Sequence, residues 1–488
     1  MATAHPITPA PGFAELGVPG ELCDVIAADG ITAPFPIQVS TLPDTLAGRD
    51  VLGRGRTGSG KTLAFGLAVV SRLAASGNKR TAGRPRALIL APTRELALQI
   101  DRTVAPLAKA MKMSTCTVFG GVGQGPQVDA IRRGVDIVIA CPGRLEDLIQ
   151  QRHCHLDRVE VSVLDEADHM ADLGFLPGVK RLLDKVPTNA QHMLFSATLD
   201  NGVSVLVQRY LDNPVTHSVD SEQSPVSTMT HHVLHVGEGD RLPVILDLAS
   251  APGRTILFTR TKHRAKQLTR ILNTNGVAAV EMHGNLSQGA RTRNLSAFSD
   301  GSATALVATD IAARGIHVDD VALVVHADPP IEHKAYLHRS VRTARAGNDG
   351  VVVTVALDGQ RGEVMTLMRK AGIRPTITTA GLGSPVLHEI APGERRRSAS
   401  PVLPPEPIPV GRQPRPSQRP GARPAGRSGG GANAAGRPGR HRSGGSSSGG
   451  GNGQPSRGGQ PGRGGQSGRG GQSGRAGQSG RSSSSQHR

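Results

Sequence analysis

Short apolar runs that alternate with longer segments of helical character place the strongest limit on the fold of this chain. They are Ala87–Ala91, Thr115–Phe119, Asp136–Ala140, Val161–Leu164 and His192–Phe195, then, after a polar stretch near residue 225, His232–Val236, Thr255–Phe258, Ala278–Met282, Thr304–Val307, Val321–His326 and Val351–Ala356. Strands that alternate with helices form βαβ units and parallel sheets. The sequence therefore predicts an α/β protein with two doubly wound parallel-sheet domains.

The distribution of charge separates this globular part from a tail. The 488-residue chain has a formal charge of +18. From Ala391 onward it contains 17 Arg, no Lys, 2 acidic residues and no aromatic residue, so residues 391–488 carry +15 of that charge. Such a segment cannot bury enough apolar area to offset the entropy lost on ordering. Residues 391–488 are predicted to be a disordered basic tail that tethers RNA through its arginines, with a merely solubilising tail as the alternative.

The cysteines and the apolar content indicate the cellular compartment of the protein. The four cysteines form no C-x-x-C pair, and His153-Cys154-His155 has no second ligand cluster at a suitable spacing, so reduced thiols are expected rather than a metal site. The sequence contains no secretory signal pattern and no apolar stretch long enough to span a bilayer. We expect a cytoplasmic protein that does not bind a membrane.

A phosphate-binding loop is the first chemical motif. Gly55–Thr62 fits the pattern G-x-x-x-x-G-K-[ST]. In such a loop the glycines let backbone N–H groups face a triphosphate, Lys61 places a positive charge at the β- and γ-phosphates, and Thr62 offers a hydroxyl to Mg²⁺. Leu63–Leu73 is predicted to be a helix whose N-terminus faces the phosphates. A glycine-rich turn without a ligand is the alternative interpretation.

An acidic cluster follows the predicted strand that ends at Leu164. It reads Asp165-Glu166-Ala167-Asp168. Ligands of open α/β sheets bind at the carboxyl ends of the strands. We expect Asp165 to hold Mg²⁺, directly or through water, and Glu166 to polarise an attacking water. An acidic loop after a strand, without a function, is the alternative.

Three arginines in the second half recur at a spacing of three residues. Arg339, Arg342 and Arg345 are predicted to lie near one face of a helix. Phosphoryl transfer needs cations near the γ-phosphate. We interpret these side chains as arginine fingers that complete the site when ATP closes a cleft between the two domains, and a solvated basic face is the alternative.

Taken together, these motifs resemble those of the DEAD-box RNA helicases, from about Phe13 to about Ile390. The matching segments are Gly30–Gln38 with Phe13 upstream, Gly55–Thr62, Pro92–Ala97, Gly120-Gly121, Cys141–Arg144, Asp165–Asp168, Ser196–Thr198, Ile256–Lys262, His283–Arg291, Ala308–Gly315 and His338–Arg345. The resemblance implies two tandem RecA-like domains and an RNA-stimulated ATPase that uses ATP and Mg²⁺ to open short RNA duplexes. It also implies RNA, as single strands and short duplexes, as the partner.

The resemblance assigns roles to individual residues. Nucleotide binding falls to Phe13, which would stack on the adenine, to Gln38, which would read its edge, and to Arg56, Thr57, Gly58, Ser59, Gly60, Lys61, Thr62 and Asp310. Catalysis falls to Lys61, Asp165, Glu166, Arg342 and Arg345, and Mg²⁺ binding to Thr62 and Asp165. Coupling falls to Asp168, Ser196, Thr198 and His338, and RNA binding to Pro92, Thr93, Arg94, Gly121, Arg144, Gly284, Arg291 and Thr309.

The chemistry of the RNA set indicates contacts to the nucleic-acid backbone. Guanidinium, hydroxyl and backbone N–H groups suit phosphate and ribose, which position a strand without reading its sequence. The chain has no Trp and only two Tyr, so aromatic platforms for bases are scarce. We expect sequence-independent binding, with the preference for RNA over DNA implied by the resemblance.

The expected domain boundaries follow from these motifs. They are a glutamine-motif region at 11–39, an ATP-binding domain at 40–220, a linker at 221–230, a C-terminal helicase domain at 231–390 and the tail at 391–488. Neither the physiological RNA nor a protein partner, in ribosome assembly or in RNA degradation, can be named from the sequence.

Several positions depart from the usual pattern of the family. Cys141 replaces a usual Thr, His317 a usual Asp, Gly55 a usual Ala, and Val341 and Ala344 two usual glycines. We expect an active ATPase that is slow or poorly coupled. An ATP-gated RNA clamp or annealing chaperone is one alternative function, and a DNA helicase of the same superfamily is another.

Overall fold

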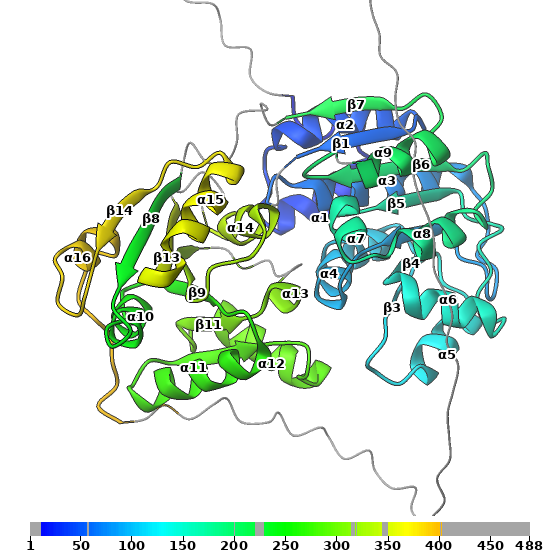
Figure 1. Cartoon of the computed structure of the whole chain (residues 1–488). Coiled ribbons are helices and arrows are strands. Elements are labelled where there is room, and N and C mark those ends of the chain that lie inside the picture. Colours follow the sequence, from blue (N-terminus) through cyan, green and yellow to red (C-terminus); the bar gives the residue numbers. More distant parts are fainter. Residues whose placement is uncertain are drawn as a thin grey trace, which may run out of the picture. The chain divides into compact units, whose positions relative to one another are not determined.

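The computed structural model describes residues 11–55, 58–199, 201–219, 229–313, 318, 320–343, 350–400 and 402. Within these residues the chain forms two seven-stranded parallel sheets, each covered by helices (Figure 1). The predicted fold class, two tandem RecA-like α/β domains, is confirmed. Arg56, Thr57, His317, Ala344 and Arg345 lie outside the described residues, as do nearly all of the linker and of the tail.

The first domain has its strands in the order β3-β4-β2-β5-β6-β1-β7. The strands are β1 Val51–Arg54, β2 Ala87–Leu90, β3 Thr115–Val118, β4 Ile137–Ala140, β5 Val161–Leu164, β6 Gln191–Ser196 and β7 Val215–Ser218. The helices are α1 Gly20–Ala28, α2 Pro36–Leu46, α3 Lys61–Ser76, α4 Arg94–Ala110, α5 Gly125–Arg133, α6 Pro142–Gln150, α7 Ala167–Asp172, α8 Leu176–Leu183 and α9 Asn201–Tyr210.

Both faces of this sheet are buried around its central strands, which explains why β2 and β4 are continuously apolar. Ala87 and Ile89 of β2 pack in a core with helices α1 to α4. Leu88 and Leu90 of the same strand pack in a second core with helices α5 to α9. Successive side chains of a strand point to opposite faces, so a strand covered on both sides needs apolar residues at every position.

The second domain repeats this plan with different residues. Its strands are β8 Met229–Val236, β9 Arg254–Phe258, β10 Ala279–Met282, β11 Ala305–Ala308, β12 Val321–His326, β13 Gly350–Leu357 and β14 Thr376–Thr379. Its helices are α10 Arg241–Ala249, α11 Lys262–Thr274, α12 Gln288–Ser299, α13 Asp310–Ala313, α14 His333–Ser340, the 3₁₀-helix Asp358–Gln360, α15 Arg361–Ala371 and α16 Val386–Ile390. The order β10-β11-β9-β12-β13-β8-β14 is the order of the first sheet, strand for strand.

The sequence pattern missed three short strands. All the predicted runs correspond to strands, but β1, β7 and β14 were not expected. β1 contains Gly53 and ends at Arg54, the edge strand β7 alternates partly buried and exposed residues, and the edge strand β14 is mostly exposed, so none of the three forms an apolar run. They form because neighbouring strands supply hydrogen bonds, as where Arg54 of β1 pairs with Ser196 of β6.

The second domain continues beyond the boundary expected at residue 390. Residues 391–400, which we call the basic strap, lie against the C-terminal ends of α10 and α11. Arg395 donates two hydrogen bonds to Asp247, at 3.0 and 2.8 Å, the Arg396 N–H donates to the Ser250 carbonyl at 2.7 Å, and the Ser398 N–H donates to the Gly276 carbonyl at 2.8 Å. Cations are favourable near helix C-termini, because the helix dipole places partial negative charge there.

No helix of the described residues is both long and apolar enough to cross a membrane.

The strap predicts where the chain can be shortened. A chain that ends at Ile390 should unfold at a temperature about 3 to 8 °C lower than one that ends at Val402, since it loses the partly buried Arg395–Asp247 pair and the strap hydrogen bonds. Differential scanning calorimetry of both chains measures this. Arg395→Ala in the full chain should reproduce part of the loss, and equal unfolding temperatures for the two shortened chains would contradict the role of the strap.

Candidate active site

The predicted site lies at the carboxyl edge of the first sheet, where three neighbouring strands end. In the order β5-β6-β1, these strands lead into the acidic cluster, Ser196 and the phosphate loop. The Gly55 N–H donates to the Ser196 carbonyl at 3.1 Å, which ties the loop to β6. Segments more than a hundred residues apart in the sequence therefore meet at one edge, as parallel strand order requires.

The phosphate loop has the backbone that its glycines allow. Gly58 and Gly60 have φ angles of +88° and +90°, a region that side chains with a Cβ disfavour. Helix α3 begins at Lys61, and it includes the helix predicted at Leu63–Leu73. The Lys61 side chain is 8% exposed, and its ammonium donates to the Gly55 carbonyl at 2.6 Å, across the loop. An N-terminal helix end with a buried ammonium beside it suits a polyphosphate.

The acidic cluster places two carboxylates next to the loop. Asp165 is 3% exposed, and burial raises the pKa of its carboxyl to about 7, with Lys61 opposing the shift and Glu166 adding to it. Glu166 has a left-handed backbone, with φ of +51°, and its carboxylate lies 2.9 Å from Nδ1 of His169. A non-glycine residue in this region is strained, and such strain is concentrated at functional sites.

The residues assigned to coupling in the first domain contact one another. One carboxylate oxygen of Asp168 accepts hydrogen bonds from the backbone N–H and the hydroxyl of Thr198, both at 2.9 Å. The Asp168 N–H donates to the Ser196 hydroxyl at 3.3 Å, and that hydroxyl donates to the Thr198 carbonyl at 2.7 Å. The acidic cluster and the segment after β6 therefore form one hydrogen-bonded unit.

The glutamine-motif region lies beside the phosphate loop. Phe13, expected to stack on the adenine, is 6% exposed and packs in the core beside α1 and α3. Gln38 is 1% exposed, and its amide bridges the Phe35 N–H, at 2.8 Å, and the Gly60 carbonyl, at 3.0 Å. Sequence reasoning did not single out Phe35, although it lies three residues before Gln38.

The RNA residues predicted in the first domain converge at the ends of β2, β3 and β4. A methyl group at Gly121 would overlap the Arg94 guanidinium, so the two residues are in contact. The Arg144 guanidinium donates to the Val122 carbonyl at 3.4 Å. Thr93 caps α4 by accepting from the Leu96 N–H at 3.2 Å, and Pro92 precedes it. Two cations therefore flank an exposed glycine turn.

The second-domain residues of this set also lie at a carboxyl edge. Gly284 follows β10 and is exposed, Thr309 follows β11, and Arg291 of α12 donates to the Ala312 carbonyl at 3.3 Å. Lys262, whose ammonium donates to the Asn285 amide oxygen at 3.2 Å, adds a cation that the predicted set did not include. Its position as the last residue of the motif Ile256–Lys262, at the start of α11, was a signal in the sequence.

The arginine repeat does not lie on one helical face, contrary to our expectation. Helix α14 ends at Ser340, and beyond it the Thr343 hydroxyl donates to the Val321 carbonyl at 2.6 Å. Arg339 is 3% exposed and holds both carboxylate oxygens of Asp310. Arg342 follows the helix and is 7% exposed. The repeat therefore contains one arginine with a structural ion pair, one that lines a small hollow with Asp310, and one outside the described residues.

Two of the departures from the family pattern are accommodated by the backbone. Val341 has φ of −68°, an ordinary value for a residue with a Cβ, and its side chain packs against the core of the second domain. Burial, with Glu95 adding to it, raises the pKa of the Cys141 thiol to about 12, so the thiol stays neutral. Neither substitution introduces strain or charge. His338, the fourth residue assigned to coupling, lies on α14 with a partly exposed side chain.

The residues present fit a hydrated Mg²⁺ better than an all-protein metal cage. No group of three or more histidine, cysteine, aspartate or glutamate side chains within the described residues could hold a metal ion. Magnesium commonly takes one or two protein oxygens and completes its shell with water and substrate phosphates. Asp165, whose charge is disfavoured by burial and by Glu166, is a carboxylate that a cation would stabilise.

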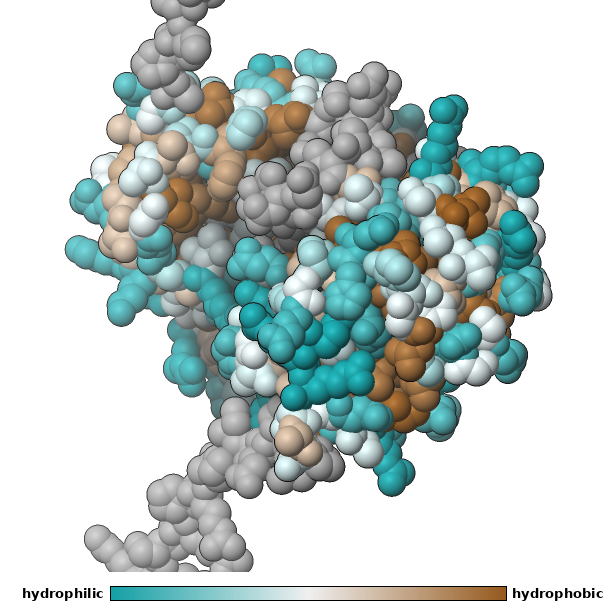
Figure 2. Space-filling model, turned by 90° about the vertical axis from the view of Figure 1, so that its left-hand side faces the viewer, coloured by the Kyte–Doolittle hydropathy of each residue, from teal (hydrophilic) through white to brown (hydrophobic). Residues whose placement is uncertain are grey.

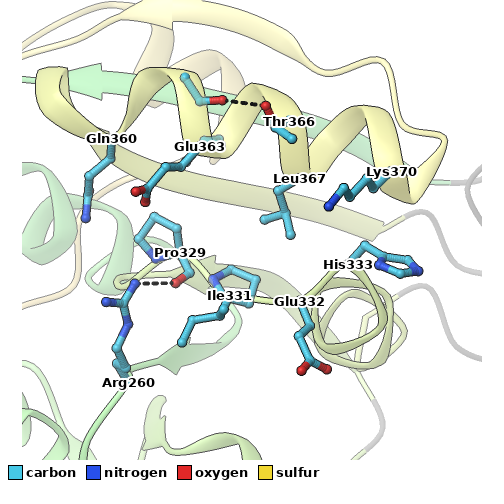
Figure 3. Close-up of a pocket in the computed structure, with 13 residues that line it drawn as sticks. Arg260, Pro329, Ile331, Glu332, His333, Gln360, Glu363, Thr366, Leu367 and Lys370 are labelled. Carbon is cyan, nitrogen blue, oxygen red and sulfur yellow. Dashed lines mark hydrogen bonds between the residues drawn. The ribbon is translucent and has the colours of Figure 1, made fainter. Parts of the chain in front are cut away.

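One further hollow among the described residues lies away from this edge. A hollow of about 670 Å³ in the second domain lies between α15 and the segment before α14, with Arg260 donating to the Pro329 carbonyl at 3.3 Å (Figure 3). Its lining lacks the predicted catalytic residues. Figure 2 shows a face on which hydrophilic side chains predominate and hydrophobic ones form small separate patches.

Comparisons with known proteins agree with the geometry. The DEAD/DEAH box helicase family model matches residues 35–205, and the helicase conserved C-terminal domain model matches residues 239–347. The chain is 40% identical over 370 residues to the chloroplastic DEAD-box ATP-dependent RNA helicase 3A of Zea mays, covering 74% of this chain and 49% of that protein. It is 38% identical over 351 residues to the ATP-dependent RNA helicase RhlB of Pasteurella multocida, covering 71% of this chain and 83% of that protein.

Solved structures extend the likeness to three dimensions. S. cerevisiae Dbp5 bound to RNA and ADP BeF3 is similar with a TM-score of 0.67 at 27% identity, covering 78% of this chain and 98% of that chain. The chain spans about half the length of the maize relative and most of the bacterial one. With both family models, relatives well above 30% identity and the same pair of folded domains, the chain belongs to the DEAD-box helicase family.

Proposed function

We propose that this protein is an ATP-dependent RNA helicase, which couples ATP hydrolysis to local opening or remodelling of RNA duplexes. The observation that carries the proposal is the convergence of the phosphate loop, the Asp165–Glu166 pair and the Asp168–Thr198 hydrogen bonds at one sheet edge. The curated relatives named above are themselves described as ATP-dependent RNA helicases. We propose the cytoplasm as its location, since its four cysteines are free thiols.

The hydrolytic step is assigned to the carboxyl edge of the first domain. The loop N–H groups and Lys61 bind the phosphates, and Gln38 fixes the loop by holding the Gly60 carbonyl. Asp165 and Thr62 would hold Mg²⁺, which supplies charge neutralisation at the β- and γ-phosphates when bound. Glu166 orients the attacking water, and His169 holds its carboxylate in place.

Coupling between hydrolysis and RNA is assigned to the hydrogen-bonded unit of Asp168, Ser196 and Thr198. A shift of the acidic cluster must change the bonds that Asp168 makes to Thr198, and so must move the segment after β6. RNA is held by backbone contacts to Thr93, Arg94, Gly121 and Arg144, with Gly284, Arg291 and Thr309 from the second domain. These groups suit phosphate and ribose and give no sequence preference.

The clamp alternative has less support. It rests on Val341 and Ala344, because a Cβ in place of a usual glycine can hinder the close approach of a nucleotide. Val341 has an ordinary backbone and packs against the core, so this position gives the clamp alternative no support from strain. Ala344 lies outside the described residues. We therefore keep unwinding as the proposed activity.

The purified full-length protein should hydrolyse ATP faster with RNA than with DNA and should release a strand from a short RNA duplex. Asp165→Asn should reduce turnover at least about 100-fold, since it removes the proposed Mg²⁺ ligand. The variant should unfold at the same or a higher temperature at pH 8 without Mg²⁺. A folded pKa near 7 means that protonated Asp165 stabilises the fold at acid pH and that this stabilisation is lost as the pH rises through 7.

Phosphate-release and strand-displacement assays on matched preparations measure these activities, and calorimetry measures the unfolding temperature. Retention on single strands with ATP, without strand release, would favour the clamp, and stronger stimulation by DNA would favour a DNA helicase. Either result would overturn the proposal.

The arginine-finger assignment predicts that Arg342 and Arg345 affect turnover, whereas Arg339 also affects stability. Arg342→Ala and Arg345→Ala should each lower kcat for ATP about 100-fold or more while the unfolding temperature changes little, because both would act on the transition state. Arg339→Ala should lower the unfolding temperature as well, since it leaves Asp310 without its bidentate partner. Undiminished turnover in the first two variants would remove the assignment.

The tail predicts a salt-dependent contribution to RNA binding. A chain that ends at Val402 retains the strap but lacks 14 of the 17 tail arginines, so it should bind single-stranded RNA more weakly and with a shallower slope of log K against log salt concentration. Fluorescence anisotropy titrations at several KCl concentrations measure the slope. An unchanged slope would indicate that the tail does not contact RNA.

A further inference from the structure

Helix α11 is unusually positive for a helix of these two domains. Its thirteen residues include four cationic side chains and no acidic one. The chain before residue 391 has a formal net charge of only +3, which is the total of +18 less the +15 of the tail. Positive charge is therefore concentrated on this one helix, while the rest of the two domains is nearly neutral. The four cations are Lys262, Arg264, Lys266 and Arg270.

Three of these cations form a line along the outside of the helix. Lys262, Lys266 and Arg270 are four residues apart, and all three are exposed. The opposite side of α11 packs in the core through Leu268 and Leu272, among others. Residues four apart are neighbours on a helix surface, and each lies about 6 Å further along the axis than the one before. We call these three residues the basic row.

The basic row is unfavourable for the helix that carries it. Like charges four residues apart repel and destabilise a helix. Lys262 also occupies the first position of α11, where the helix dipole disfavours a cation. Within the part of the chain that the structure describes, neither the Lys266 nor the Arg270 side chain makes a hydrogen bond or an ion pair. Since the fold gains no stability from these charges, a partner with negative charge is the better explanation for them.

Acidic side chains on the neighbouring elements face other cations. Asp328, after β12, lies 3.3 Å from Arg264, and Asp247 of α10 lies 2.8 Å from Arg395 of the basic strap. Glu238 lines a hollow between α10 and α11 together with Arg264. The acidic groups on this side of the domain are therefore matched by Arg264 and by the strap, and the basic row keeps its positive charge.

The basic row begins at the edge to which the RNA contacts of the second domain are assigned. Helix α11 follows β9, and the carboxyl end of β9 lies at the same sheet edge as those of its neighbours β11 and β10. The Lys262 ammonium donates to the Asn285 amide oxygen at 3.2 Å, next to Gly284. A strand held at this edge therefore reaches the first cation of the row without leaving the domain.

The other end of α11 is where the strap fixes the start of the tail. The Ser398 N–H donates to the Gly276 carbonyl at 2.8 Å, and the Val402 N–H donates to the Asn273 carbonyl at 3.0 Å. Figure 1 shows the strap, in orange, passing the end of the domain to which α11 belongs. A helix of thirteen residues is about 20 Å long. The basic row therefore lies between the RNA edge and the point from which the tail departs.

We propose that the exposed face of α11 is a second RNA-binding surface. The basic row holds the phosphates of the strand beyond the carboxyl edge of the second domain and directs that strand toward the tail. The inference rests on the proposed function, because it needs RNA at that edge. A nucleic-acid backbone is a line of negative charges, and a line of cations binds it without reading its sequence.

Neutralising the row should weaken the binding of long RNA in particular. In the full chain, Lys266→Gln with Arg270→Gln should lower the affinity for a long single strand about fivefold or more at low salt, and should reduce the slope of log K against log salt concentration by about 1. The affinity for a strand of about 8 nucleotides, which fills little more than one binding edge, should change less than twofold. Hydrolysis of ATP without RNA should be unchanged. Fluorescence anisotropy and phosphate-release assays measure these quantities.

A matched control removes the same charge from the opposite face of the same sheet. Arg369 and Lys370 are exposed on α15, which packs in the other core of the second domain. Arg369→Gln with Lys370→Gln should leave the affinity for the long strand and its salt slope within error of the parent. Equal losses in the two double variants would show that net charge alone matters, and they would overturn the assignment to α11.

Charge reversal separates binding from folding. Lys266→Glu places an opposite charge four residues from both Lys262 and Arg270, so it should keep or raise the unfolding temperature. The same variant should bind the long strand more weakly than Lys266→Gln does. A fall in RNA affinity that accompanies a fall in unfolding temperature would indicate a structural role for Lys266, and it would contradict the proposal.

Crosslinking gives a direct readout of the contact. A long single strand that carries 4-thiouridine, irradiated on the parent chain and digested, should yield crosslinked peptides from α11 by mass spectrometry, and the row variant should lose them. If the parent binds no RNA, the proposed function fails. If the parent binds RNA and the row variant keeps its salt slope, the second surface alone fails. Loss of binding to anionic phospholipid vesicles or to polyglutamate in the row variant, with RNA binding unchanged, would assign the row to another partner and overturn the proposal.

Discussion

The burial of parallel strands on both faces is the constraint on which the rest of the protein depends. A strand covered by helices on either side loses all contact with water except at its ends, so polar chemistry is confined to the loops. Parallel strands bring their carboxyl ends to the same edge, and β1, β5 and β6 are neighbours there. The phosphate loop, the acidic pair and Ser196 therefore meet because of strand order, without any contact between their sequences.

The same constraint explains how one architecture occurs twice in the chain. Both sheets have an identical strand order, although the two halves share no long repeat in sequence. What the halves share is a pattern of apolar strands and amphipathic helices, and that pattern is enough to specify a doubly wound sheet. The loops at the carboxyl edge differ, so one domain carries the phosphate loop and the other carries the arginines after α14.

Two features of the site lower the stability of the fold, and the protein keeps both. Asp165 is nearly inaccessible and next to Glu166, and its charged form is disfavoured. Glu166 adopts a left-handed backbone that only glycine takes without strain. Stability alone would remove both features, and both suit the roles proposed here, in which Asp165 attracts a cation and Glu166 polarises a water. Around them, Lys61, His169 and Gln38 each hold a defined partner, so the site is largely organised before any ligand binds.

The sequence by itself determined the fold class, the phosphate loop, the acidic pair and the tail composition, because strand and helix patterns and loop motifs are local properties. It also predicted that Asp168 and Thr198 belong together, through resemblance. Only the tertiary structure decided which face each side chain took. Phe13 and Phe35 are equally aromatic in sequence, but the first completes a core against α1 and the second lies on the surface beside Gly60. The spacing of the arginines likewise suggested one helical face, but α14 ends at Ser340, before Arg342, and the next turn is tied to β12 through Thr343. Burial depends on which segments meet in space, and the linear pattern does not contain that information.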